Sequence, residues 1–597
     1  MVINSNPNGV DVPFEYDITP PATLDPRRNF IRQLAVGSIA GGALLEISAR
    51  EAFAQSSAGA VAQTVQVKGY GSVNVKDFGA VGDGVTDDAP AVQKAINAVS
   101  SGTVFFPMGS YLVGRAGLSI ANKTGVILSG AGATIKIGGV STLHDAFGSA
   151  CILFHNSSNC GINNVTIQGN NHATTAISLY NCTDCVIDNN NVSGCGKYGL
   201  INAIGGGSRN RITNNTLFNP LTSGAAGIRA GNYNATDMEN NIYVVGNNIY
   251  DCHSGHDAMV ISSNGGRIAD NFCSDSTGTA GTGINFGGAN GYASNNLTIS
   301  NNIVMACGEG IQSDVIYKTD ADIPSRITIS GNVLYQNMNA GIYVPTLQNS
   351  AITGNICINN NNANVTSFNG IDLTNKCYEV IVTGNLCLDT RSGASVTQDK
   401  GIAITSGISG NPRDITISGN ICKNNKTNGI FINAAPSSLL TGITIIGNVC
   451  NHNLGYGISI TEVDPGSITF VTVIGNSCNN NKSIDLRTSL LDVIAENNRY
   501  NTEQDVSHMS FPENSATPSV YGRRFWRANN GSPTIINAFN SGQDGQEITI
   551  LAANGNTTIA HGRTLILKGA TPATLAQDQM ITLVRQGKLW REKCRSF

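Results

Sequence analysis

The stretch ITISGNICKNN, residues Ile415–Asn425, shows the pattern that decides the fold. Apolar and polar residues alternate in it, as in a short β-strand, and a Gly-Asn pair marks a bend before a second short strand. Variants of this stretch recur along the chain, and their aligned Asn residues lie 20 to 35 residues apart: Asn170, Asn190, Asn215, Asn247, Asn271, Asn302, Asn332, Asn355, Asn385, Asn420, Asn448, Asn476 and Asn497. Helical repeats are the competing class, but these units are rich in Gly, Asn and β-branched residues. The period therefore predicts a parallel β-helix.

Equivalent residues of successive coils in a β-helix stack about 4.8 Å apart, so the aligned Asn can hydrogen-bond to the neighbouring coil. Two residues after each Asn lies an inward position that Val, Leu and Ile share with six cysteines: Cys273, Cys357, Cys387, Cys422, Cys450 and Cys478. Cysteine that exchanges with aliphatic residues acts as a small apolar core residue. The odd total of 15 cysteines also argues against a complete disulfide framework. We expect neither a zinc site nor a redox role.

The N-terminus has the features of an export signal. Arg27 and Arg28 precede a modestly apolar run that is interrupted by Glu46 and ends at Ala52–Ala54. This pattern is typical of a twin-arginine signal with cleavage after Ala54. A membrane anchor is the alternative, but a span needs roughly 20 apolar residues. We expect a mature chain that is periplasmic or extracellular and has no membrane contact after cleavage.

Composition limits the classes of partner. Charged residues make up 13% of the chain, and Gly reaches 68, which is typical of many short strands and tight turns. The net charge of −4 and the pI near 6.1 provide no basic footprint, so nucleic acid is not expected as a partner. An acidic polysaccharide stays open, because a local basic patch could hold it.

The segment VKDFGAVGDGVTDDAPAVQKAINAVSSGTVFFPMGSYLV, residues 75–113, predicts a strand, a Gly/Asp loop, a helix and a return strand. Asp87 or Asp88 is the expected helix N-cap, and Pro90 lies in the first turn. The apolar face of this helix comprises Ala91, Val92, Ala95, Ile96 and Val99. It is expected to cover the N-terminal opening of the β-helix. The acidic residues around it lack the spacing of an EF-hand, so calcium is not indicated.

This segment closely resembles the opening of the pectate lyase superfamily, in particular the rhamnogalacturonase and epimerase-like pectate lyase group. The resemblance covers about Val73–Val113, and the coil repeats extend it to about residue 500. It implies a right-handed parallel β-helix with carbohydrate as ligand, commonly a uronic-acid-containing polysaccharide. It leaves the reaction open, because lyases, hydrolases, epimerases and phage tailspike proteins share this architecture.

We therefore expect an all-β chain with five parts. These are the signal peptide 1–54, an N-terminal cap with a helix over 55–113, the coils 114–500, a linker 501–519 and a small antiparallel β module over 520–597. The module contains Trp526 and Trp590. It resembles C-terminal modules of phage tail and bacterial surface β-helix proteins, which often cap or trimerise the shaft, and on this ground we consider a homotrimer.

A column of outward positions on the middle coils is the expected site. In each repeat, the strand with the pattern Gly, apolar, x, apolar directs x outward, and the x residues are Arg229, Val260, Asn285, Gln312, Tyr343, Asp372, Ala403 and Phe431. The position before the Gly adds Asp257 and Glu309, and the neighbouring loops add His256, Asp314 and Lys318. We expect catalytic residues among Asp257, Glu309, Tyr343, Arg229 and His256. Substrate binding is expected at Asn285, Gln312, Asp314, Lys318 and Asp372.

Two mechanisms compete at this column. An inverting glycosidase needs two carboxyl groups about 6.5 to 9.5 Å apart, and Asp257 and Glu309, two coils apart, should lie about 9.6 Å apart. A β-eliminating lyase needs a group that neutralises the uronate carboxylate and a base, for which Arg229, Tyr343, Lys318 and His256 are available.

No recognised catalytic motif can be transferred to this sequence. The polygalacturonase set, the Asp-Pro-His-Glu motif of alginate epimerases, the Arg-x-Pro-x-x-Arg of calcium-dependent pectate lyases and a GGxGxD array are missing. We predict no metal and no cofactor. The expected function is an exported lyase or glycoside hydrolase on a uronic-acid-containing polysaccharide. The alternative is a non-catalytic, glycan-binding adhesive or tailspike-like protein.

Overall fold

The computed structural model describes residues 71–597 apart from 147, 197, 221–225, 232–236, 252–256, 276–280, 288–292, 314–322, 365–366, 408–409, 465, 484–485, 489–492, 497, 501–508, 521–524 and 543. The expected signal peptide lies outside the described residues. Among those described, no helix is both long and apolar enough to cross a membrane.

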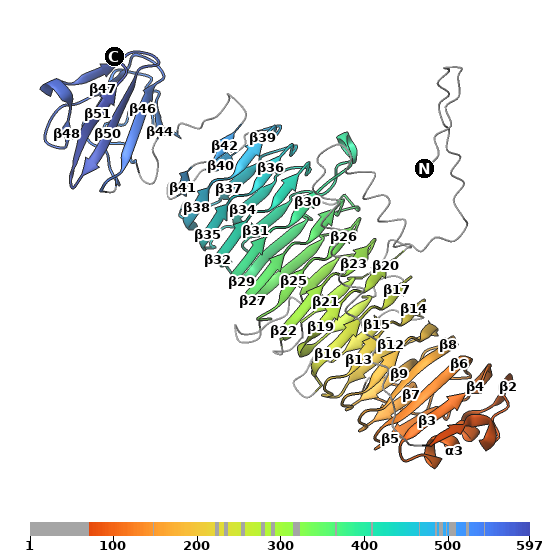
Figure 1. Cartoon of the computed structure of the whole chain (residues 1–597). Helices are drawn as coiled ribbons and strands as arrows, with labels where there is room; N and C mark the ends of the chain where they lie inside the picture. The colour runs from red at the N-terminus through yellow and green to blue at the C-terminus, as the bar shows by residue number, and fades with distance from the viewer. Residues whose placement is uncertain are drawn as a thin grey trace, which may run out of the picture. The chain divides into compact units, whose positions relative to one another are not determined.

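Most of the described chain forms one parallel β-helix, in which strands of successive coils pair in parallel and build three sheets (Figure 1). Sheet 1 contains β5 (Leu118–Ala121), β7 (Ala150–His155), β9 (Thr175–Tyr180), β12 (Gly199–Ile204), β15 (Ala226–Ala230), β18 (Met259–Ile261), β21 (Ile284–Phe286), β24 (Ile311–Ser313), β31 (Ile402–Thr405), β34 (Ile430–Ala434), β37 (Ile458–Glu462) and β40 (Leu486–Thr488). Two longer strands, β27 (Ile342–Thr353) and β29 (Ile371–Thr383), belong to both sheet 1 and sheet 2.

Sheet 2 contains β1 (Ser72–Asn74), β3 (Gly102–Phe106), β10 (Val186–Asp188), β13 (Arg211–Thr213), β16 (Glu239–Val245), β19 (Ser263–Ala269), β22 (Asn295–Ser300), β25 (Thr328–Ser330), β32 (Arg413–Ser418), β35 (Leu440–Ile446), β38 (Ile468–Ile474) and β41 (Val493–Glu496). Both β6 (Val126–Ile137) and β8 (Gly161–His172) run through sheet 2 and sheet 3.

Sheet 3 contains β2 (Asp83–Asp87), β4 (Gly109–Val113), β11 (Asn191–Cys195), β14 (Thr216–Phe218), β17 (Asn248–Tyr250), β20 (Phe272–Ser274), β23 (Ile303–Met305), β26 (Val333–Tyr335), β28 (Ile356–Ile358), β30 (Leu386–Leu388), β33 (Ile421–Lys423), β36 (Val449–Asn451), β39 (Ser477–Asn479) and β42 (Arg499–Tyr500). Alternate residues of each strand face inward and form one continuous apolar core. The predicted parallel β-helix is confirmed. The coils begin earlier than the expected residue 114, because β1 already pairs with β3.

The bend between sheets 2 and 3 is held by the predicted Asn ladder. Each buried Asn accepts hydrogen bonds from the backbone N–H and the side-chain amide of the Asn one coil before it; Asn302, for example, donates both to Asn332 Oδ1, each at 2.9 Å. Its side-chain amide also donates to Ile268 O, so one side chain connects three coils. The ladder comprises Asn190, Asn215, Asn247, Asn271, Asn302, Asn332, Asn355, Asn385, Asn420, Asn448, Asn476 and Asn498.

Two of the predicted ladder positions differ. In its coil Val165 N donates to Asn190 Oδ1, so the ladder position there is that of Val165 and not of Asn170, whose side chain bonds to Ile137 O instead. At the far end the ladder residue is Asn498, and Asn497 lies outside the described residues. The repeat alignment was displaced because runs of consecutive Asn make the register ambiguous in the sequence.

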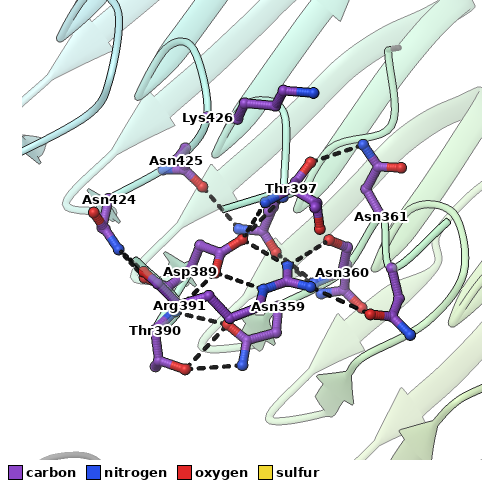
Figure 2. A network of polar contacts seen from close by, with 12 residues as sticks. Asn359, Asn360, Asn361, Asp389, Thr390, Arg391, Thr397, Asn424, Asn425 and Lys426 are labelled. Carbon is purple, nitrogen blue, oxygen red and sulfur yellow. Dashed lines mark hydrogen bonds and ion pairs between the residues drawn. The ribbon is translucent and has the colours of Figure 1, made fainter. Parts of the chain in front are cut away.

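A second amide ladder was not predicted; its members lie five residues after those of the first, except that Gln398 lies 13 residues after Asn385. It runs through Asn337, Asn360, Gln398, Asn425, Asn453 and Asn481. Figure 2 shows its centre, where the Asp389 carboxylate accepts from the guanidinium of Arg391 and from the backbone N–H of Thr397 and Gln398. Both carboxylate oxygens of Asp389 accept hydrogen bonds, so this cluster holds the turn in place.

The inward cysteines stack as predicted. Cys357, Cys387, Cys422, Cys450 and Cys478 pair directly in five successive coils, and all five are fully buried free thiols. Burial raises the pKa of Cys387 and of Cys450. The sequence also contains a Cys-x-x-Cys pair, Cys182 and Cys185, that the repeat analysis passed over; both side chains are buried in the same apolar core.

Helix α3 (Ala89–Ala98) is present at the first coils, with Ala89, Val92, Ala95 and Ile96 buried (Figure 1). Of the two expected N-caps, Asp88 points away from the helix, because its carboxylate accepts from the backbone N–H of Val81 and Gly82. Asp87 Oδ1 accepts from Ala89 N at 3.1 Å. A 3₁₀ turn, η1 (Val75–Phe78), precedes helix α3 in the chain.

Residues 509–597 form a separate module with its own core. One sheet orders β43 (Met509–Ser510), β44 (Phe525–Ala528), β46 (Glu547–Ala552), β50 (Met580–Gln586), β51 (Leu589–Arg595) and β48 (Leu565–Ile566), and the other orders β45 (Thr534–Ile536), β47 (Thr557–Ile559) and β49 (Ala573–Leu575). The expected antiparallel module is confirmed, since β50 pairs antiparallel with β46 and β51, and β47 pairs antiparallel with β49. It also contains parallel pairs, those of β44 with β43 and β46. The expected linker is also too long: Phe511 is buried and stacks on Trp526, with ring centroids 5.0 Å apart.

Candidate functional site

Strand pairing in sheet 1 brings the predicted column together. Arg229 pairs with Val260, and the register continues without interruption through Asn285, Gln312, Tyr343, Asp372, Ala403 and Phe431. The alignment of the Gly-apolar-x-apolar pattern therefore gave the correct neighbours. The catalytic and binding roles of these residues stay predictions, and His256, Asp314 and Lys318 lie outside the described residues.

The column is less open than an outward-facing surface was expected to be. Arg229 is 8% exposed and Asp372 6% exposed, whereas Asn285, Gln312 and Tyr343 are half-buried. On the two coils before Arg229, the same outward position is covered by the segment between β6 and β7. There the carboxylate of Asp145 accepts from Ser178 Oγ and Asn202 Nδ2, which occupy the same column positions two coils and one coil before Arg229.

Asp257 lies beside the column and is held by the next coil. Its Oδ1 accepts from Thr282 N at 2.8 Å, and its Oδ2 accepts from Asn285 Nδ2 at 3.1 Å. Thr282 Oγ1 in turn donates to Gln312 Oε1 at 2.8 Å. Burial raises the pKa of Asp257, although these hydrogen bonds and the charge of Arg229 act in the opposite direction. Asp257 is thus suited to keep its proton longer than an exposed carboxyl group.

Glu309 occupies the same flanking position two coils further on. Backbone bonds fix this register, since Ala258 N donates to Thr282 O and Gly283 N donates to Glu309 O. The side chain is half-buried, and its Oε1 accepts from Asn339 Nδ2 at 2.8 Å. A carboxylate held by an amide donor at a partly open position is suited to act as a base.

Tyr343 and Asp372 are adjacent in the column. Burial raises the pKa of Tyr343, and the charges of Asp372 and Glu309 add to this effect. Burial also raises the pKa of Asp372 to about 7, partly offset by a hydrogen bond from Asn369 and by the charge of Lys400. Asp372 Oδ2 accepts from Asn369 Nδ2 at 2.8 Å, while Asp372 Oδ1 is buried without a hydrogen-bond partner.

Two of the polar residues around Asp372 were not predicted. Asn369 and Lys400 occupy the flanking position that Asp257 and Glu309 occupy on earlier coils, and the same Gly-apolar pattern marks both in the sequence. Lys400 forms an ion pair with Asp399 and lies over the ring of Phe431, 5.1 Å from its centroid. Within the described part of the chain, no group of three or more His, Cys, Asp or Glu side chains is arranged to hold a metal ion.

Comparison with known proteins confirms the resemblance seen in the N-terminal segment. Residues 72–323 match the family model described as rhamnogalacturonase A/epimerase, pectate lyase-like. Residues 510–591 match the phage depolymerase C-terminal β-sandwich domain.

Curated relatives match only part of this chain. Mannuronan C5-epimerase AlgE4 of Azotobacter vinelandii is 38% identical over 120 residues, which are 17% of this chain and 20% of the relative. The preneck appendage protein of Bacillus phage PZA is 37% identical over 112 residues, which are 18% of this chain and 12% of the relative. The chain thus spans a fifth or less of the length of these two relatives.

Solved structures align with this chain at low sequence identity. The Dettilon tailspike protein aligns with a TM-score of 0.45 and 17% identity, covering 70% of this chain and 68% of that one. An exopolygalacturonase from Thermotoga maritima aligns with a TM-score of 0.38 and 14% identity, covering 59% and 87%.

Proposed function

We propose that this chain, whose residues 72–323 form a pectate lyase-like β-helix, hydrolyses a polysaccharide bound along the sheet 1 column. The observation that carries the proposal is the pair Asp257 and Glu309, which share one flanking position two coils apart. Two coils correspond to about 9.6 Å, just above the carboxyl separation of about 6.5 to 9.5 Å in inverting glycosidases. The matches to a mannuronan epimerase and to a phage depolymerase module support this class of substrate.

The two carboxyl groups have different environments, and this difference assigns their roles. Asp257 has a raised pKa through burial, so it acts as the acid that protonates the leaving glycosidic oxygen. Glu309 acts as the base that takes a proton from water as the water attacks the anomeric carbon from the opposite face. Asn285 lies on the coil between them and Gln312 on the coil of Glu309, and both can bind sugar hydroxyl groups.

β-Elimination is the second candidate mechanism. Arg229 favours it, because a guanidinium beside the site can neutralise a uronate carboxylate. Tyr343 argues against it, because burial and the neighbouring carboxyl groups raise the pKa of Tyr343 and keep the phenol protonated. A protonated phenol can donate a hydrogen bond but cannot remove the C5 proton.

Glycan binding without catalysis is the alternative function, and the match of residues 510–591 to a phage depolymerase module fits a protein that attaches to a polysaccharide surface.

We further propose export through the twin-arginine signal at residues 1–54. A homotrimer is a proposal of the same kind. Its test is the mass of the purified chain by light scattering.

A polymer screen separates the three functions. The chain is incubated with polyuronates and neutral polysaccharides while reducing ends and the ultraviolet absorbance of unsaturated products are followed. Hydrolysis predicts reducing ends without absorbance, and loss of activity by at least about a hundredfold in Asp257→Asn and in Glu309→Gln. Asp414→Asn, at an exposed position of sheet 2, is the matched control. Absorbance that is lost with Tyr343→Phe would establish a lyase, and binding without any product would establish the adhesive function.

A further inference from the structure

The turns that lead from sheet 3 to sheet 1 change in charge along the β-helix. On the coils of β17, β20 and β23, the described charged residues of these turns are acidic: Asp251, Asp257, Asp275 and Glu309. On the coils of β30, β33 and β39, the described charged residues are mostly basic: Arg391, Lys400, Lys423, Lys426 and Lys482, beside Asp389 and Asp399. The charge of these turns therefore changes sign on the later coils.

Both acidic residues of the later turns are neutralised by ion pairs. The carboxylate of Asp389 pairs with Arg391, and that of Asp399 pairs with Lys400. Figure 2 shows the guanidinium of Arg391 directed at the Asp389 carboxylate. These two pairs contribute no net charge to the surface.

Three lysines remain without an ion pair within the described part of the chain. Lys423 and Lys482 are exposed, and Lys426 is half-buried. Lys426 Nζ donates to the amide oxygen of Asn364 at 2.8 Å, which does not neutralise its charge, and in Figure 2 its side chain extends away from Asp389. We name Lys423, Lys426 and Lys482 the lysine strip.

The register of the coils sets the spacing of the lysine strip. Lys423 and Lys426 belong to one coil. Lys426 and Lys482 each come directly after a member of the second amide ladder, and these two ladder members lie two coils apart. Two coils correspond to about 9.6 Å. The three ammonium groups are therefore spread over a short stretch along the axis of the β-helix.

Amide groups hold the turns beneath the lysine strip and surround it. Asn424 Nδ2 donates to the carbonyl oxygens of Asp389 and Arg391, at 2.5 and 2.9 Å, and so ties two successive turns together. The side chains of Asn362 and Asn364 lie beside these groups on exposed residues. Ammonium groups donate hydrogen bonds to carboxylates, and amides both donate to and accept from hydroxyl groups.

We propose that the lysine strip binds carboxylate groups of an acidic polysaccharide, as a second glycan-binding surface outside the sheet 1 column. A polyuronate carries a carboxylate on every sugar, so one polymer can contact several ammonium groups at once and gain affinity from each. The exposed amides beside the strip can bind its hydroxyl groups. The proposal does not rest on hydrolysis, because the strip anchors the polymer whether or not the column cleaves it.

Phosphate-rich polyanions fit the lysine strip less well. Phosphate is favoured by guanidinium groups, which bind two of its oxygens at once. The guanidinium of this turn, that of Arg391, already donates from Nε and Nη2 to Asp389. Nucleic acid and anionic lipid are therefore the ligands that the test has to exclude.

The test compares a charged and an uncharged form of one polymer. Polygalacturonate and its fully methyl-esterified form are titrated against the full chain with Glu309→Gln, which prevents turnover under the proposed mechanism. The same titrations use this chain with Lys423→Gln/Lys426→Gln/Lys482→Gln, and with Arg at the three positions, which retains the charge. Dissociation constants are measured at low and at high salt.

A matched control changes the net charge by the same amount at a distance from the strip. It is Lys76→Gln/Lys94→Gln/Arg115→Gln, at three exposed residues between η1 and β5. Vesicles of phosphatidylglycerol and a single-stranded DNA oligonucleotide are the phosphate-bearing probes.

We expect the Gln variant of the strip to bind polygalacturonate at least about tenfold more weakly at low salt, and this difference to decrease at high salt because the attraction is screened. The Arg variant and the matched control should stay within about twofold of the parent chain, because the charge of the strip is retained in both. The affinity for the esterified polymer should not change.

Three results would overturn the proposal: an unchanged affinity of the Gln variant for polygalacturonate, an equal loss in the matched control, or an equal loss for the esterified polymer. A larger loss for the vesicles or the oligonucleotide than for polygalacturonate would also overturn it and assign the strip to phosphate. The absence of any product in the polymer screen would refute hydrolysis and leave these expected affinities unchanged.

Discussion

Replacement of one ladder residue, Asn385→Ala, tests whether the amide ladder holds the coils together. Asn385 is 1% exposed, and its Oδ1 accepts from both the backbone N–H and the Nδ2 of Asn355, each at 2.9 Å. Its Nδ2 donates to Ile352 O and to Asn420 Oδ1, also at 2.9 Å. The substitution removes these four bonds and leaves buried donors and acceptors on both neighbouring coils.

The magnitude follows from these contacts. A hydrogen bond contributes about 1 kcal/mol net, so four bonds correspond to about 4 kcal/mol of local stability. Because a tenfold change in an opening equilibrium corresponds to about 1.4 kcal/mol, 4 kcal/mol corresponds to exchange of the local amide hydrogens about a thousandfold faster. Hydrogen exchange is the appropriate assay because repeat proteins open locally, so exchange reports the stability of the substituted coils themselves.

The measurement follows peptides that contain β28 and β30, which flank Asn385 and its partner Asn355, in the unsubstituted chain and the variant. Asn97→Ala is the control, since Asn97 is exposed on α3 and outside the ladder. An increase of less than tenfold in β28 and β30 would refute the reasoning. So would an equal increase in the control.

Three further predictions follow from buried polar groups. Burial raises the pKa of Glu239 to about 7 from an ordinary 4.5, so the folded chain binds this proton more tightly than the unfolded chain. The resulting contribution to folding stability is complete below about pH 4.5 and is lost as the pH rises to 7. Glu239→Gln should remove about 3 kcal/mol of this pH dependence, and thermal melting between pH 4 and 8 measures it. Cys422→Ser should destabilise the coils by about 2 kcal/mol because it buries a hydroxyl group, more than Cys422→Ala does, in melting under reducing conditions. Asp389→Ala leaves the guanidinium of Arg391 without its buried partner and should cost about 3 to 5 kcal/mol, seen as protease cleavage of this turn. The control is Asp184→Ala, which removes the exposed ion pair with Arg209 and should leave protease cleavage unchanged.

The sequence predicted the sheet 1 column well and its exposure poorly. The pattern Gly, apolar, x, apolar fixes which residues are neighbours, because a one-residue shift would expose the inward Ile and Leu positions. For this reason Tyr343 and Asp372 could be paired in advance. The cover over sheet 1 comes from segments outside the repeat, such as the one that carries Asp145 over the two coils before Arg229. These segments have no period from which their position could be predicted.

By itself the sequence determined the β-helix, the Asn ladder and the apolar role of the stacked cysteines. Each repeat buries its apolar residues only by stacking on the next, so the repeated pattern predicts a stack of coils. Only the tertiary structure decided which polar groups are paired. The carboxylate of Asp88 bonds to the loop before the helix, and that of Asp389 accepts from backbone N–H groups of a turn. Asp372 has one oxygen without a hydrogen-bond partner. Hydrogen bonding and burial depend on residues that are distant in the chain and meet only when the coils stack, and these two properties set the pKa values on which the proposed chemistry rests.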